Sequence, residues 1–247
     1  MKELSEEIRF LANSQGIDLV GIGPAEGYKP SDVLSDAKSI VVLAIKTPDH
    51  IVESGSPKER KEQAAFAEQE MYRVGYHIAK LLFEKGFIAY PVSANSFSIA
   101  TLSQHFRTPE WLSAFEKHPS MIDHLRGQIP LVYAGYKAGL GIIGRSGLLI
   151  TPQFGPRVHI GALVTNAPLE TSRPLEIDFC ENCDMCEKAC VGKSISEKGR
   201  DPIKCWRAEW EKGEPIPGFP FKLCPALCLK NCPVGKPGII APPRSLS

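Results

Sequence analysis

The stretch "CENCDMCEKAC", residues 180–190, contains four of the eight cysteines in this chain of 247 residues. The other four follow it, and residues 1–179 contain no cysteine at all. In a reducing compartment, clustered thiols are more often metal ligands than disulfides. The sequence therefore predicts two domains: a cysteine-free α/β domain over residues 1–169 and a metal-binding domain over residues 170–247.

The spacing Cys-x2-Cys-x2-Cys-x3-Cys in this stretch is typical of ferredoxins with two [4Fe–4S] clusters. Three of its cysteines hold one cluster, and the fourth ligates the other cluster. The later cysteines then complete both sites by reciprocal donation. One predicted set is Cys180, Cys183, Cys186 and Cys232, and the other is Cys190, Cys205, Cys224 and Cys228.

Zinc is the alternative ligand for these thiols, because Cys-x2-Cys pairs also build closed tetrahedral zinc sites. Two zinc ions would use eight thiolates equally well, but the run of x2, x2 and x3 favours iron and sulfide.

Two details depart from the usual ferredoxin pattern. Val191 rather than a proline follows Cys190, and three residues rather than two separate Cys224 from Cys228.

The cysteine-free part alternates short apolar runs with helical patterns. The runs at 17–23, 39–45, 87–94 and 158–165 predict strands, and Pro91 places the third at an edge or a bulge. Periodic apolar residues predict an amphipathic helix at the N-terminus and a long helix over 58–85. Such alternation indicates an α/β sandwich.

Composition narrows the class of protein. With 43% hydrophobic residues, 23% charged residues and a formal net charge of +1, the chain offers no polybasic face for nucleic acid or a membrane. No apolar run reaches the roughly 18–20 residues of a membrane helix, and the N-terminus has no apolar signal-peptide core. We therefore expect a cytoplasmic protein.

The segment "AGYKAGLGIIGRSGLLITPQFGPRVHIGALVT", residues 134–165, has too many glycines for a regular helix. Its backbone is expected to approach another group closely or to take positive φ angles. Gly139, Gly141 and Gly144 fit the G-x-G-x-x-G dinucleotide fingerprint. However, no clean strand precedes them and no acidic residue follows about 20 positions on, which disfavours a nicotinamide site.

The run "AGLGIIGRSGLLITPQFGPRV", residues 138–158, followed by the cysteine motif, resembles the cobalamin-dependent iron–sulfur reductases. This family comprises the epoxyqueuosine reductases and the reductive dehalogenases. "GLLITPQFGPRV" is nearer the dehalogenases, whereas "GIDLVGIGPAE" near the N-terminus resembles the opening of epoxyqueuosine reductases. The resemblance spans roughly residues 5–235. It implies a nitroreductase-like α/β sandwich that holds a corrinoid, with a C-terminal ferredoxin-like two-cluster module stacked against it.

The resemblance also implies a function: a reductase in which a low-potential donor, such as ferredoxin or flavodoxin, feeds electrons through two [4Fe–4S] clusters to base-off cobalamin. The substrate would be a small organic molecule. Tyr133, Tyr136 and Arg157 are the candidates for proton delivery, with surface packing as the alternative for the tyrosines and an ion pair for the arginine. The implied corrinoid-binding residues are Gly139, Leu140, Gly141, Gly144, Arg145, Gly147 and Leu148.

Some features depart from the family or have plainer explanations. Gly127 stands about where epoxyqueuosine reductases have an acidic proton donor, and we expect the protein to lack the C-terminal helical repeats that this family uses for tRNA. With the neutral charge, this argues against a nucleic-acid partner. Trp206 and Trp210 are expected to shield a cluster, and residues 56–63 to form a solvated helix start. Two alternatives stay open: an electron-transfer protein that reduces a partner or its corrinoid, and a body that holds flavin.

Overall fold

The computed structural model describes residues 1–26, 34–92, 117, 129–215 and 222–237. The position of Gly127 lies outside the described residues, as do residues 93 and 94 at the end of the third predicted strand. None of the helices in the described ranges is both long and apolar enough to cross a bilayer.

Four strands form one antiparallel sheet: β1 (Leu19–Pro24), β2 (Ser39–Lys46), β3 (Ala89–Val92) and β6 (Val158–Thr165). Their order in the sheet is β1-β2-β6-β3. The two central strands pair along their whole length, with Ile40 opposite Val164 and Leu43 opposite Gly161. Proline lacks a backbone donor, and Pro91 lies on the edge strand β3, as predicted. The four strands predicted from the sequence are therefore confirmed.

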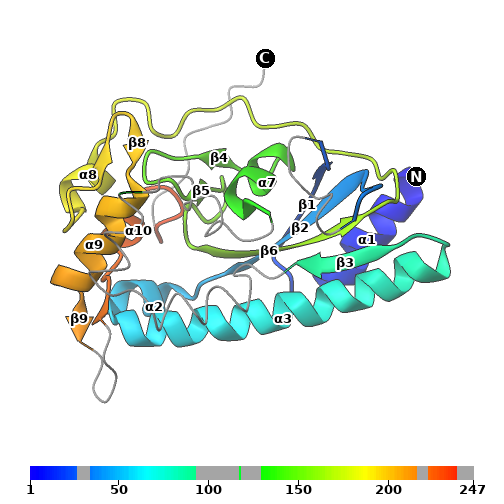
Figure 1. The fold of residues 1–247 in the computed structure, drawn as a ribbon, viewed down its shortest axis with the longest axis horizontal. Helices are drawn as coiled ribbons and strands as arrows, with labels where there is room; N and C mark the ends of the chain where they lie inside the picture. Colours follow the sequence, from blue (N-terminus) through cyan, green and yellow to red (C-terminus); the bar gives the residue numbers. More distant parts are fainter. Residues whose placement is uncertain (27–33, 93–116, 118–128, 216–221, 238–247) are drawn as a thin grey trace.

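Helices α1 (Lys2–Ser14) and α3 (Pro57–Glu84) cover one face of this sheet (Figure 1). The hydroxyl of Ser56 accepts a hydrogen bond from the amide of Glu59 at the start of α3, and Pro57 occupies the first turn. Both features are typical of helix starts. The long predicted helix is therefore confirmed. Its buried face joins the first apolar cluster, which includes Ile8, Val41, Met71, Ile78 and Leu163.

The opposite face of the sheet carries α7 (Leu131–Lys137) and the small hairpin of β4 (Ile142–Ile143) and β5 (Leu149–Ile150). The end of α7 approaches β1 very closely. A Cβ atom on Gly21 would lie 2.7 Å from the carbonyl oxygen of Ala138. These contacts position the glycine-rich segment on the sheet, next to the second apolar cluster.

The cysteine-rich elements gather at one end of the sheet, where α2 (Asp49–Ser54) and the start of α3 also lie (Figure 1). The mixed α/β fold is thus observed, and the boundary between domains at residues 169 and 170 stays a prediction. These elements are α8 (Met185–Ala189), β7 (Ile195–Ser196), β8 (Gly199–Arg200), α9 (Pro202–Lys212), β9 (Glu214–Pro215), β10 (Lys222–Leu223) and α10 (Leu227–Lys230).

Candidate functional site

The first predicted ligand set surrounds a single cavity. Its four thiols come from the loop before α8, from α8 itself and from the loop after α10, and all eight cysteines of the chain are free. The described residues include no group of three His, Cys, Asp or Glu side chains arranged to hold one metal ion. The four thiols instead border a hollow. Its lining consists of Cys180, Cys183, Cys186, Cys232, Ser146, Ile150, Phe179, Met185, Pro233 and Val234.

The first cysteine loop is held by hydrogen bonds from both sides. The amide of Cys180 donates to the Asp178 carboxylate at 2.7 Å, and the amide of Cys183 donates back to the Cys180 carbonyl at 3.2 Å. The Arg145 amide donates to the sulfur of Cys180 at 3.4 Å. The guanidinium of Arg145 also pairs with Glu187 of α8 at 3.5 Å. The glycine-rich segment therefore borders the first group of thiols directly.

Cys232 is positioned by a contact between two glycines. A Cβ atom on Gly155 would lie 1.8 Å from the Val234 carbonyl oxygen, and one on Gly235 would lie 2.0 Å from the carbonyl carbon of Phe154. Both glycines also have positive φ angles, 57° and 72°. Side chains are excluded on both counts. This backbone-to-backbone contact fixes the loop of Cys232 against the turn that follows β5.

The four thiols of the second predicted ligand set form a separate group. Burial raises the pKa of Cys228 to about 12, and the charges of Cys224, Cys205 and Cys190 add to the shift. Burial also raises the pKa of Cys205 and of Cys224. These three thiols, whose pKa values are raised, become thiolates readily only beside a strong cation, which is the environment that a bound metal provides.

Cys190 differs from the other thiols of its group. Burial acts to raise its pKa, but hydrogen bonds from the hydroxyl and amide of Ser194 and from nearby amides outweigh burial, so the pKa is lowered. The sulfur lies 3.2 Å from the Ser194 hydroxyl and 3.3 Å from the Ser194 amide.

In the first group, burial followed by the charges of the three other thiols raises the pKa of Cys232 to about 11. The structure thus gathers the two sets that the spacing predicts, and their role as ligands stays a prediction.

The residues predicted to bind a corrinoid lie between the end of α7 and the start of β5. The close approaches of the glycines among them are to the chain itself. A Cβ atom on Gly141 would lie 2.2 Å from the Ile150 carbonyl oxygen. Leu140 packs in the second apolar cluster and Leu148 against the third. Corrinoid binding at these positions stays a prediction. The remaining glycines of the set, which also face protein atoms, are Gly139, Gly144 and Gly147.

The two candidate tyrosines lie on α7, with ring centroids 6.2 Å apart. Tyr136 is partly buried against the second apolar cluster, and Tyr133 is 36% exposed. The position of Tyr136 fits the packing alternative. A role of either hydroxyl in proton delivery stays a prediction.

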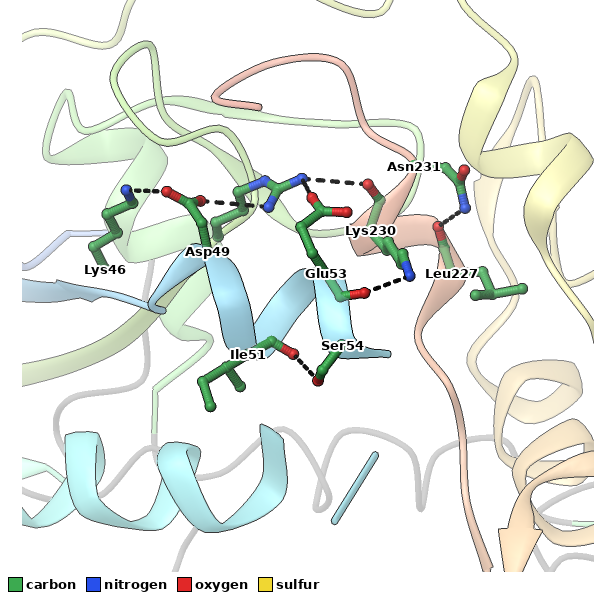
Figure 2. Close-up of polar contacts among 9 residues, drawn as sticks. Lys46, Asp49, Ile51, Glu53, Ser54, Leu227, Lys230 and Asn231 are labelled. Atoms are coloured by element: carbon green, nitrogen blue, oxygen red, sulfur yellow. Dashed lines mark hydrogen bonds and ion pairs between the residues drawn. The ribbon is translucent and has the colours of Figure 1, made fainter. Parts of the chain in front are cut away.

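Arg157 is fully buried. Its partners, Asp49 and Glu53 on α2 and Lys230 at the end of α10, lie close together (Figure 2). Its guanidinium pairs with Asp49 at 3.4 Å and with Glu53 at 2.8 Å, both on α2. It also donates to the carbonyl of Lys230 at 3.3 Å, at the end of α10. The ammonium of Lys230 returns a hydrogen bond of 2.7 Å to the Glu53 carbonyl. These partners support the ion-pair alternative, and proton delivery by Arg157 stays untested.

Arg60 corrects the prediction that residues 56–63 form a wholly solvated helix start. Its guanidinium is half-buried and donates to the carbonyls of Cys224 and Pro225, the latter at 3.0 Å. A sequence signal was present: Arg60 lies about two helical turns before Ala67, on the buried face of α3. Only the exposed residues of the run, such as Lys58 and Glu59, behave as predicted.

Comparison with known proteins identifies relatives of two kinds, although no family model matches the chain. An epoxyqueuosine reductase of Listeria monocytogenes is 29% identical over 181 residues, which cover 73% of this chain and 42% of the relative. A tetrachloroethene reductive dehalogenase of Sulfurospirillum multivorans is 27% identical over 226 residues, covering 80% of this chain and 42% of the relative.

Solved structures of both kinds share the fold. A reductive dehalogenase structure, described with a mechanism for B12-dependent dehalogenation, matches with a TM-score of 0.65 and 20% identity, covering 95% of this chain and 32% of that one. An epoxyqueuosine reductase solved with an epoxyqueuosine-modified tRNA stem loop matches with a TM-score of 0.62 and 16% identity, covering 98% of this chain and 69% of that one.

The fold and the cysteine-rich site define a mixed α/β protein whose homologues are named reductases. This chain is a homologue of the epoxyqueuosine reductases and the reductive dehalogenases, and the resemblance predicted from its sequence motifs is confirmed. The chain spans less than half the length of the reductase from Listeria monocytogenes and of the dehalogenase from Sulfurospirillum multivorans.

Proposed function

We propose that this chain is an oxidoreductase that carries electrons through two [4Fe–4S] clusters to a cobalamin. Iron–sulfur clusters supply one-electron transfer when bound, and a corrinoid supplies the substrate chemistry. The observation that carries the proposal is the hollow bordered by four thiols, directly beside the glycine-rich segment shared with the reductases.

The chain's own side chains would hold the clusters and keep water from them. The first cluster would be bound in the cavity, where Phe179 and Met185 contribute apolar walls. The Arg145 amide would donate to one of its ligand sulfurs. The second cluster would be bound by the second group of thiols. In that group the Ser194 amide donates to the sulfur of Cys190, and the Ala226 amide donates to the sulfur of Cys224. Hydrogen bonds to sulfur and exclusion of water are the means by which proteins set cluster potentials.

The corrinoid is proposed from the homology alone, because the close approaches of the described glycines are satisfied within the protein. We infer a small organic substrate, as for a dehalogenase. One related structure contains a tRNA stem loop, so the comparisons leave a nucleic-acid substrate open and give the expectation against it no support. The donor would be a low-potential protein such as ferredoxin or flavodoxin.

The test is metal and sulfide analysis of the full chain purified without oxygen. We expect about eight iron and eight sulfide per chain, the content of two cubane clusters. A double variant, C183S with C186S, should lose about half, because it removes two ligands of one site only. Zinc in place of iron and sulfide in the unaltered protein would refute the proposal.

The corrinoid is tested separately, by gel filtration after incubation with cobalamin. A stoichiometric amount retained with the protein supports the reductase. Clusters without retained cobalamin would favour the second candidate, an electron-transfer protein that reduces a partner. That candidate gains support from the intramolecular packing of Gly139, Gly141 and Gly144. A flavin released on denaturation would instead show that the body holds flavin.

A further inference from the structure

The guanidinium of Arg60 lies against the loop that carries two cysteines of the second group. We propose that Arg60 is a positioning residue that holds this loop in shape and raises the reduction potential of the cluster bound there. The inference rests on the proposed function, because it requires a cluster at the second group of thiols.

The contacts of Arg60 fix a cation beside the cysteine loop. Both terminal nitrogens of its guanidinium donate to backbone carbonyls of the loop, those of Cys224 and Pro225. Burial lowers the pKa of Arg60, and the thiolates of Cys224 and Cys228 act most strongly in the opposite direction, ahead of two glutamates. An arginine keeps its charge in such surroundings because its guanidinium loses a proton only at very high pH. The cation is therefore held next to the sulfurs.

The loop that Arg60 holds contains a disfavoured turn. Ala226, which caps the start of α10, has φ 49° and ψ 44°, a left-handed conformation that is disfavoured for a residue with a Cβ atom. In this conformation its amide donates to the sulfur of Cys224 at 3.4 Å. Such turns persist only where surrounding contacts hold them. The two hydrogen bonds from Arg60, on the carbonyls immediately before Ala226, are contacts of that kind.

The electrostatic consequence follows from the charge of a reduced cluster. Accepting one electron from a donor such as dithionite adds one negative charge to a cluster. A nearby cation and an amide that points at sulfur therefore stabilise the reduced form more than the oxidised form. Beside the first group, the guanidinium of Arg145 pairs with Glu187, whereas both terminal nitrogens of Arg60 donate to carbonyls of the cysteine loop of the second group. The effect of Arg60 should be confined to the second cluster.

The experiment is an anaerobic potentiometric titration with dithionite, in which electron paramagnetic resonance follows each cluster separately. R60M removes both the charge and the two hydrogen bonds, and we expect it to lower the midpoint potential of one cluster only. R60K keeps the charge but loses the paired donors, so it should give a smaller shift. The signal that belongs to the second cluster is identified with C228S.

The matched control is R73M, because Arg73 lies on the same helix but is exposed and paired with Glu70. It should leave both potentials unchanged. Should R60M alone fail to hold iron, R60M with A226G takes its place, measured against A226G, because glycine removes the strain of the turn. Unchanged potentials in the charge-removing variant with full iron content would overturn the role of Arg60. Absence of iron and sulfide from the unaltered protein would instead refute the proposed function.

Discussion

Single glycines hold the two halves of the first thiol group together. Gly155 has a positive φ angle and also meets the Val234 carbonyl, whereas Gly86 has a positive φ angle and no atom within 4 Å of its Cβ position. We expect G86A to cost about 1–2 kcal/mol, the strain of the conformation alone. G155A adds a clash with backbone and should cost at least about 3 kcal/mol.

The measurement for this pair is the midpoint of thermal unfolding, together with iron content. G155A should also release iron, because the clash displaces the loop of Cys232, whereas G86A should keep it. Equal losses of stability in the two variants would show that the contact between residues 155 and 234 has no role beyond the φ angle.

The environment of His159 predicts that the free energy of unfolding depends on pH. Its pKa is lowered, chiefly by burial and then by the positive charges of Arg60 and Lys61, while Glu68 opposes them. In the described part of the chain its Nε2 atom has no hydrogen-bond partner. The unfolded chain therefore binds a proton at higher pH than the folded protein does. Stability should fall as the pH drops below about 6.5 and level off below the lowered pKa.

The variant H159L removes the titrating group, and Nε2 makes no hydrogen bond within the described part of the chain that this variant would lose. Thermal midpoints of both proteins, measured anaerobically between neutral and mildly acidic pH, should diverge as the pH falls, with the variant gaining relative to the unaltered protein. Parallel pH profiles would contradict a buried neutral histidine. Any effect of acid on the clusters is common to both proteins and cancels in the comparison.

At the scale of elements, the buried side chain of Arg157 links α2 to α10. Figure 2 shows Glu53 of α2 beside Lys230 of α10, where this link lies. Arg157 has no exposed surface, although its partners Asp49 and Glu53 are 30% and 37% exposed. We expect R157M to cost about 3 kcal/mol, since it breaks the ion pair of a buried arginine with Glu53 and removes its hydrogen bond to the Lys230 carbonyl, while Asp49 keeps its pair with Lys46. The cost should appear as a lower thermal midpoint and faster loss of iron.

The control for this prediction is K58M, because the pair of Lys58 and Glu62 on α3 is exposed and 3.9 Å long. Its loss should change stability by less than about 1 kcal/mol. A similarly small effect of R157M on stability, together with loss of substrate turnover, would return Arg157 to the role in proton delivery that its motif suggested.

Elements with a strong apolar pattern could be predicted, and those held by isolated contacts could not. The four strands and the long helix follow from runs such as 39–45 and from the periodic stripe through Met71 and Ile78. Helix α9 was not predicted, because its cysteine-rich surroundings have few apolar residues. A capping signal was present in Asp201 followed by Pro202, and the Asp201 carboxylate accepts the amide of Lys204 at 3.0 Å.

The candidate site could be predicted in part for a similar reason. Cysteine spacing carries the grouping of thiols, since ligand loops are local and have a characteristic length. The contacts of Arg60 and Arg157 with residues 224–230 join parts of the chain that lie far apart in sequence. No local pattern encodes which carbonyl a distant arginine meets. Sequence alone therefore assigned Arg60 to a solvated helix start and left proton delivery and an ion pair open for Arg157.

At the scale of the whole molecule, the two ends of the sheet differ in what stabilises them. The sheet and its helices bury a large apolar core. Among the described residues after 170, the buried hydrophobic side chains are Ile195, Ala208 and Val234. So small a core cannot offset the conformational entropy of this region, which should depend on bound metal for its order. The predicted division at residues 169 and 170 would then be a division in stability.

Removal of iron from the full chain tests this division. After treatment with an iron chelator, we expect backbone amides of residues 180–215 and 222–237 to exchange hydrogen much faster, because the metal–sulfur bonds are lost and few apolar contacts remain. Amides of β2 and β6, in the centre of the sheet, should keep their protection. Loss of protection throughout the chain would mean that sheet and cysteine-rich region unfold as one unit, joined by Arg60 and Arg157. Unchanged protection in residues 180–215 and 222–237 would mean that metal contributes no folding energy, in conflict with the charge and burial of the eight thiols.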